Sequence, residues 1–139
     1  MKVFFDTNVY VAEALLGSAA TELIEGTVRL RWRILSSLYV LEETERVLVE
    51  KLGFSRRLGV LTREHVRRRA QLVPMMASRH QVPSDPADNP ILATAVAAGA
   101  DFLVTNDAHL LALDPYQGLR IISMTDYYQL LVDQGHISA

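Results

Sequence analysis

Short apolar runs alternate along the chain with longer stretches in which apolar residues recur every three or four positions. These patterns predict four strands, at 2–5, 31–35, 101–105 and 120–123, of which the first is expected to be buried on both faces and the second shows alternation. The helical periodicity predicts helices over 9–30, 38–52, 63–76, 91–98, 108–113 and 125–134. Strands that alternate with helices indicate an α/β sheet covered by helices on both faces.

Residues that begin or end helices refine these boundaries. Gly17 and Gly26 are expected to break the first helical stretch into two short helices, and Gly53 to end the next one. The side chains expected to cap the later helices are Ser36 or Ser37, Thr62 and Thr125.

The composition is that of one packed globular domain over residues 1–139. Half of the 139 residues are apolar and 22% are charged, which argues against disorder and long linkers. No apolar run approaches the roughly 20 residues that a membrane helix needs. The opening MKVFFD reaches an acid too early for the core of a signal peptide. We therefore expect a cytoplasmic protein that has no membrane partner.

The chain has no cysteine, which excludes disulfides, thiol nucleophiles and cysteine-based zinc sites. Its four histidines are scattered without the paired spacing of metal ligands. Any metal ion must therefore be held mainly by oxygen atoms.

Charge is segregated along the sequence although the net charge is −2. Residues 55–82 hold seven arginines against one acid, Glu64, whereas residues 83–139 hold seven aspartates against one base, Arg120. The arginine fork matches phosphate oxygens, so the first stretch can bind a nucleic-acid backbone or can form a solvated basic face. The candidates for phosphate contacts, with Phe54 nearby, are Arg56, Arg57, Arg67 and Arg68.

Two aspartates follow predicted strands directly. Asp6 comes after the strand 2–5, and Asp107 comes two residues after the strand 101–105. Ligands of parallel sheets bind beyond the carboxyl ends of the strands, so these positions suit a functional site. The alternative for either residue is a turn or a helix cap.

Glu43 differs from its neighbour Glu42 in its position on the predicted helix. Val40 and Val47 flank Glu43 on the same face of the helix, so we expect its carboxylate beside the buried stripe. We expect no basic partner for it on its own helix, which leaves the carboxylate available to a ligand. Glu42 lies with Glu45 and Arg46 on an exposed face.

The remaining acids and polar residues near the strand ends are assigned by position. Asp88 precedes a predicted helix and is either a ligand or an N-cap, and Asp85 is a turn residue or a supporting partner. Asp101 begins its strand at the opposite edge of the sheet and is expected to be structural. Asn8 and Thr105 flank the strand-end acids and can hold them by hydrogen bonds.

Several carboxylates that converge without Cys or His form a hard, oxygen-only site, which Mg²⁺ and Mn²⁺ prefer. These ions serve phosphoryl chemistry, in which they activate water and stabilise the charge that develops on the phosphate.

Four segments together extend over nearly the whole chain in the order found in one family. They are VFFDTNV at 3–9, the stretch 37–48 with Glu43, DPADNPILATA at 85–95 and ADFLVTND at 100–107. With these segments the chain resembles the PIN-domain ribonucleases, most closely the small toxin components of type II toxin–antitoxin modules. The resemblance implies a Rossmann-like three-layer sandwich with a central, mainly parallel sheet of four or five strands.

The same resemblance implies a Mg²⁺- or Mn²⁺-dependent endoribonuclease. We expect single-stranded RNA as its substrate, because the chain is small and a basic groove can hold a single strand without the extra elements that grip a duplex. Its catalytic and metal-binding acids match four positions here, Asp6, Glu43, Asp88 and Asp107, and Asn8 and Thr105 match the flanking polar positions. It also implies a homodimer and an antitoxin partner. Two alternatives stay open, a PIN-like module that binds RNA or protein through an inactive site, and a DNA nuclease. A haloacid-dehalogenase type of phosphatase needs a second acid where Asn8 stands.

Overall fold

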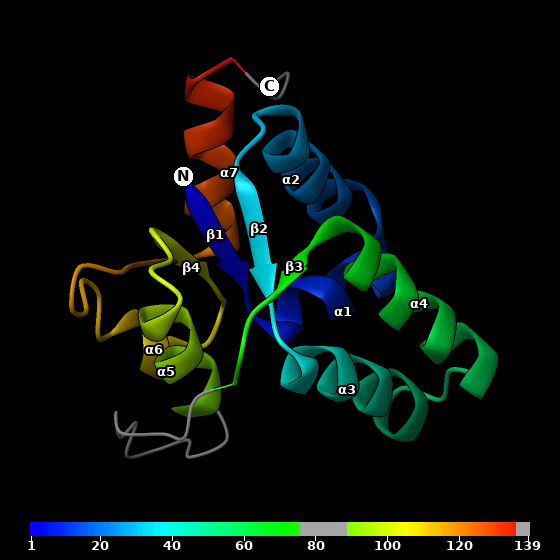
Figure 1. Cartoon of the computed structure of the whole chain (residues 1–139). Coiled ribbons are helices and arrows are strands. Elements are labelled where there is room, and N and C mark those ends of the chain that lie inside the picture. The colour runs from blue at the N-terminus through cyan, green and yellow to red at the C-terminus, as the bar shows by residue number, and fades with distance from the viewer. Residues whose placement is uncertain (76–88, 136–139) are drawn as a thin grey trace.

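A five-stranded parallel sheet forms the centre of the protein (Figure 1). The structure is a computed structural model that describes residues 1–75 and 89–135. The strands lie in the order β3-β2-β1-β4-β5, and each pairs in parallel with its neighbours. Their bounds are β1 (Lys2–Phe5), β2 (Arg33–Ser36), β3 (Gln71–Leu72), β4 (Phe102–Val104) and β5 (Arg120–Ile122). The predicted α/β architecture is confirmed.

Helices cover both faces of this sheet, which makes a three-layer sandwich. The helices are α1 (Thr7–Leu16), α2 (Ser18–Arg29), α3 (Leu38–Arg46), the π-helical η1 (Val47–Lys51), α4 (Arg56–Arg69), α5 (Asn89–Ala97), α6 (Ala108–Leu111) and α7 (Met124–Asp133). Figure 1 shows α5 in front of the sheet and α7 behind it, beside α2. Right-handed crossovers account for α2 and α5 lying on opposite faces, because the chain moves outward from β1 to β2 through α2 and returns from β3 to β4 through α5.

The core is centred on β1, whose residues Val3, Phe4 and Phe5 are fully buried. The ring of Phe5 makes edge contacts with Tyr10 of α1 and Tyr127 of α7, at centroid distances of 6.0 and 5.9 Å. The hydroxyls of Tyr127 and Thr27 lie 2.6 Å apart and join α7 to α2. Burial raises the pKa of Tyr127 to about 12. This packing fixes the direction in which β1 delivers the residues that follow it.

An ion pair between α1 and α4 is largely enclosed. Arg69 donates to both carboxylate oxygens of Glu13, at 2.8 and 2.6 Å, and the two side chains are about one-tenth exposed. Burial opposes the charge on Glu13, but the hydrogen bond and positive charge of Arg69 lower the pKa of that carboxyl below its usual value. Arg69 is therefore a structural residue, which separates it from the exposed arginines beside it.

Several predicted helix breaks, caps and ends differ from the structure. Gly26 does not break α2, because it is buried inside that helix and does not adopt a positive φ. Gly17 has a φ of 78° and separates α1 from α2, as predicted. Ser123 rather than Thr125 caps α7 by accepting from Asp126 N at 3.1 Å. The helix predicted over 63–76 begins earlier, at Arg56, because Ser55 caps it, and ends at Arg69, where the chain turns into the unpredicted strand β3.

In the ranges that the structure describes, no helix is both long enough and apolar enough to cross a membrane.

Candidate active site

The strands β1 and β4 lie side by side at the point where the order of the sheet reverses. From β1 the chain moves outward to β2 and β3, then returns to β4 on the other side of β1. The crossovers that leave these two strands diverge, so the carboxyl ends of β1 and β4 border the crevice in which α/β sheets bind ligands. Asp6 follows β1 and Asp107 follows β4 by three residues.

Asp6 is 4% exposed and is held on both carboxylate oxygens. Its Oδ1 accepts a hydrogen bond from Thr7 N at 2.6 Å, which caps α1, and its Oδ2 accepts from Thr105 Oγ1 at 2.7 Å. Its backbone N–H donates to Val104 O at 3.0 Å, which extends the pairing of β1 with β4. Asp6 is thus fixed at the carboxyl edge of the sheet.

Thr105 joins the two strand-end acids. Its fully buried hydroxyl donates to Asp6 and accepts from the backbone N–H of Asp107 at 3.0 Å. The Oδ1 of Asp107 accepts from His109 N and Leu110 N, at 2.8 and 3.1 Å, and so caps α6. Thr105 thus forms a hydrogen bond with a strand-end acid, and both aspartates also serve as helix caps.

Three buried oxygen atoms near the carboxyl ends of β1 and β2 accept no hydrogen bond from the described residues. They belong to Thr7, Asn8 and Ser36, and the first two directly follow Asp6. Buried oxygens without partners are uncommon and are explained when a water or an ion completes them. Oxygen atoms of this kind are ones that Mg²⁺ and Mn²⁺ accept as ligands, although Tyr10 of α1 and Thr44 of α3 also hold buried hydroxyls without a partner among the described residues. Thr7 and Ser36 were not predicted, although both are polar residues at a strand end.

Glu43 lies on α3, which packs against α1. Its side chain is 24% exposed, and its Oε1 accepts from Arg46 Nη2 at 2.8 Å. The expectation that Glu43 has no basic partner on its helix is therefore wrong, because Arg46 follows at the i+3 position, where helical side chains meet. Within residues 1–75 and 89–135 there is no group of three or more acidic or histidine side chains that could hold a metal ion.

The other predicted acids fall into two groups. Asp85 and Asp88 lie outside the described residues. Asp101 accepts a hydrogen bond on Oδ2 from Lys2 N at 2.8 Å, at the amino end of β1. Asp101 therefore joins β1 to β4 at the edge opposite Asp6, as expected.

The four arginines proposed for phosphate contacts all lie exposed on α4. Arg56 and Arg57 begin the helix and Arg67 and Arg68 end it, so the two pairs are separated by most of its length. Arg67 is already paired with Glu64 at 3.0 Å. Arg56 borders a hollow of about 270 Å³ that it shares with Arg46 and Arg63 and with three glutamates.

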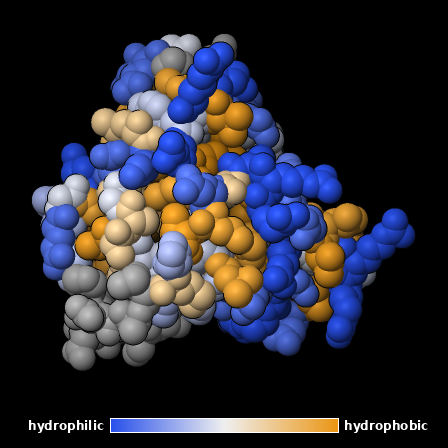
Figure 2. All heavy atoms as spheres, viewed as in Figure 1, coloured by the Kyte–Doolittle hydropathy of each residue, from blue (hydrophilic) through white to orange (hydrophobic). Residues whose placement is uncertain are grey.

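The surface of α4 also carries apolar side chains. Leu58, Val60 and Leu61 are about half exposed. Figure 2 shows a hydrophobic group among hydrophilic residues on the side of the molecule where α4 lies. The mixture of charge and apolar area makes α4 a surface with two possible uses, contact with RNA and contact with protein.

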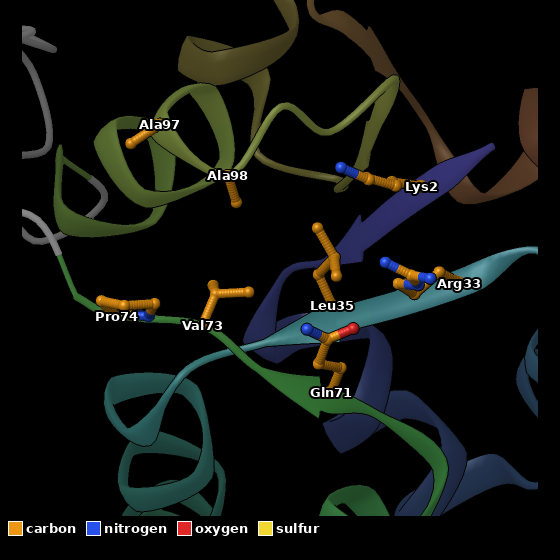
Figure 3. A pocket seen from close by; sticks show the side chains of 8 residues that line it. All are labelled: Lys2, Arg33, Leu35, Gln71, Val73, Pro74, Ala97 and Ala98. Carbon is orange, nitrogen blue, oxygen red and sulfur yellow. The ribbon is translucent and has the colours of Figure 1, made fainter.

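A hollow of about 180 Å³ lies between α5 and the sheet (Figure 3). Leu35 and Val73 face Ala97 and Ala98 across it, and Lys2 is at one end. None of the described residues that line this hollow is an acid. It is therefore separate from the candidate site at Asp6 and Asp107.

The fold and the strand-end acids agree with a comparison against known families. A family model described as PIN domain matches residues 2–109, a range that includes β1 through β4, Asp6, Glu43 and Asp107. The chain belongs to the PIN domain family, which has a nuclease-type fold and whose members typically use divalent metal ions. No curated protein matches the chain.

Proposed function

We propose that the protein is a metal-dependent endoribonuclease that hydrolyses phosphodiester bonds in single-stranded RNA. The observation that carries the proposal is the connection Asp6–Thr105–Asp107 at the reversal point of a PIN-domain sheet. Two acids held at this position have structural roles as caps, but capping alone does not require that one buried hydroxyl join them.

Mg²⁺ or Mn²⁺ is the cofactor that suits these residues. Asp6 and Asp107 would hold the ion, with Glu43 and Asp88 as the other proposed ligands. When bound, such an ion lowers the pKa of water and stabilises charge on a phosphate. Thr105 orients Asp6, and Asn8 and Asp85 are the proposed supporting residues. The buried Oδ1 of Asn8, which has no partner among the described residues, supports its assignment.

Single-stranded RNA is the proposed substrate because exposed arginines of α4 can follow a flexible phosphate backbone without gripping a duplex. Arg56, Arg57, Arg67 and Arg68 are the proposed contacts. We further propose a cytoplasmic toxin that acts as a homodimer and is restrained by an antitoxin protein. The exposed leucines of α4 support the existence of a protein partner.

A second candidate function is an RNA- or protein-binding module with a weak site. The ion pair of Glu43 with Arg46 favours it, because a carboxylate engaged by a guanidinium is less available to a metal ion. A DNA nuclease is the other alternative. Comparing the cleavage of RNA and DNA oligonucleotides distinguishes it from a ribonuclease.

Incubation of the purified protein with defined RNA and DNA oligonucleotides, in Mn²⁺, Mg²⁺ or EDTA, tests the proposal. We expect Mn²⁺-dependent cleavage of RNA that Asp6→Asn, Glu43→Gln, Asp88→Asn and Asp107→Asn each reduce at least about a hundredfold. Glu42→Gln and Asp101→Asn are the matched controls, because Glu42 is exposed and Asp101 lies at the opposite edge. Cleavage that persists in EDTA, or equally in Asp6→Asn, would contradict the proposal.

A further inference from the structure

A groove of about 420 Å³ lies beside the candidate active site, between α1, α2 and α7. Leu16, Leu23 and Met124 contribute apolar lining, and Asn106 contributes a polar side chain. The groove opens to solvent, since Leu16 is 83% exposed. Its volume is near the lower end of the range found for small-molecule sites, roughly 300–1,000 Å³.

Asn106 connects the groove to the strand-end acids. It directly precedes Asp107, and its Oδ1 accepts a hydrogen bond from Met124 N at 3.1 Å. This bond fixes the start of α7 against the end of β4. A nucleotide whose phosphate lies at Asp107 therefore has the groove within reach of its base.

The chemistry of the lining suits a neutral, flat and partly polar group. The groove is lined without any Lys, Arg, His, Asp or Glu among the described residues. Tyr128 lines it and donates its hydroxyl to Glu22 Oε2 at 3.0 Å, which places an acid just beyond the ring and disfavours a phosphate. Tyrosine rings stack on bases, and the polar side chains of Thr125 and Gln129 can bond a base edge.

We propose that this groove binds one base of the single-stranded RNA whose backbone lies at Asp6 and Asp107. The proposal rests on the proposed function, since it names the subsite by which the same site selects its substrate. A partner protein is the other occupant that an exposed Leu16 suits. The base is favoured because Asn106, the neighbour of Asp107 in the chain, lines the groove, and because the polar lining residues Asn106, Thr125 and Gln129 are uncharged.

Binding measured without cleavage separates this proposal from the nuclease activity. We suggest fluorescence anisotropy with short oligomers of A, C, G and U in EDTA, for wild type, Ala19→Trp and Val28→Trp. Ala19 is exposed on α2 and lines the groove, so the indole would fill it, whereas Val28 is exposed on the same helix outside the groove. Loss of one stacked base corresponds to an affinity decrease of about 5- to 150-fold.

We expect Ala19→Trp to weaken binding within that range, Val28→Trp to bind like wild type, and Gln129→Ala to change the order of preference among the four bases. Tyr128→Ala is expected to weaken binding and Tyr128→Phe to restore it, since the ring is retained. Equal affinities for Ala19→Trp and Val28→Trp would overturn the proposal. A change in oligomeric mass for Ala19→Trp, measured by light scattering without RNA, would also overturn it and assign the groove to a protein partner.

Cleavage of RNA by the wild type with Mn²⁺ is recorded in parallel. If the wild type binds RNA but does not cleave it, the proposed function fails. The comparison of the two tryptophan variants then still shows whether the groove binds a base of the RNA. If the wild type cleaves and both variants bind alike, the groove proposal alone fails.

Discussion

Thr105 supplies, with one hydroxyl, both hydrogen bonds that join the strand-end acids. It donates to Asp6 Oδ2 and accepts from Asp107 N, and it is fully buried. A buried group that loses its partner costs about 1–3 kcal/mol, so both contacts influence stability as well as geometry. At the residue scale, the position of each acid depends on this side chain as much as on the acid itself.

Thr105→Val removes the hydroxyl and keeps the shape of the side chain. We expect the free energy of unfolding to fall by about 1–3 kcal/mol, measured in urea, because Asp107 N–H loses its acceptor. The rate of Mn²⁺-dependent cleavage should fall about tenfold to a hundredfold, because Asp6 loses its orientation. Thr105→Ser retains the hydroxyl and should keep most of the activity. Wild-type cleavage by Thr105→Val would show that Thr105 does not position the site.

Arg46 forms an ion pair with Glu43 and would therefore compete with the proposed metal ion for that carboxylate. It donates to Glu43 at 2.8 Å and lies 3.9 Å from Glu50. If Glu43 is a metal ligand, Arg46→Met should lower the Mn²⁺ concentration for half-maximal cleavage by up to about fivefold, as expected for an exposed pair. Arg63→Met is the control, because it removes an arginine of α4 that pairs with Glu45, a glutamate on the same helix as Glu43. An unchanged Mn²⁺ dependence in Arg46→Met would argue against Glu43 as a ligand.

At the scale of elements, α4 packs on α3 and η1 through Gly59. A Cβ atom at Gly59 would lie 2.6 Å from Val49 Cγ2 and 3.3 Å from Glu45 Cγ. The absence of a side chain therefore lets two helices approach closely. Ordinarily, glycine inside a helix costs about 1 kcal/mol relative to alanine, so its presence here reflects packing rather than propensity.

A double-mutant cycle tests this contact. Gly59→Ala gains helix propensity but overpacks against Val49, which typically costs about 1–3 kcal/mol, so we expect a net loss of up to about 2 kcal/mol. In a Val49→Ala background the same change should be stabilising by about 1 kcal/mol, because the clash is gone. Urea unfolding of the four proteins measures both effects. Stabilisation by Gly59→Ala in the wild-type background would show that Val49 gives way.

The strands that carry the site were predicted well because their signal is local. β1 and β4 are short apolar runs that end at a polar residue, and both are buried between helices. β3 was missed because its two exposed residues, Gln71 and Leu72, have no pattern and become a strand only by pairing with β2. Contacts between distant residues, such as Asp6 with Thr105, follow from the sheet order, which the sequence pattern does not specify.

At the scale of the molecule, the basic and acidic stretches of the sequence lie on different parts of the fold. The arginines of 55–75 lie on α4, and Asp6 and Asp107 lie at the carboxyl edge of the sheet. Residues 56 and 68 are separated by about 18 Å along a helix. A strand of RNA that meets both ends of α4 must therefore run along its length.

The salt dependence of RNA binding tests these contacts. Each lost phosphate contact should reduce the single-strand slope of log K against log salt by about 0.7. Arg57→Ala and Arg68→Ala should each show this change, since neither arginine forms an ion pair with a described residue. Arg67→Ala should show less, because Glu64 already neutralises Arg67. Arg120→Ala, on β5 and paired with Asp114, is the control. An unchanged slope in all three variants would assign α4 to a solvated face or to a protein interface.

Metal binding should also raise the melting temperature of the protein, which can be measured without substrate. Acids gathered at one edge repel one another, and a divalent ion that binds only the folded arrangement stabilises it by mass action. At an Mn²⁺ concentration of about 100 times Kd, the gain is about 2.7 kcal/mol. In a chain of this size that corresponds to a rise in Tm of roughly 8 °C.

Asp107 allows the metal role to be separated from the cap role. Asn caps a helix about as well as Asp, whereas Ala costs about 1 kcal/mol. Asp107→Asn should therefore melt at or above the wild type in EDTA, because one repelling charge is gone, but gain less from Mn²⁺. Asp107→Ala should melt lower in EDTA, since His109 N and Leu110 N lose their acceptor, and should gain equally little from Mn²⁺. Asp101→Asn, at the opposite edge, should respond to Mn²⁺ as the wild type does. If Asp107→Asn melts well below the wild type in EDTA and Mn²⁺ shifts neither protein, Asp107 is a cap alone and the nuclease proposal loses its physical basis at this residue.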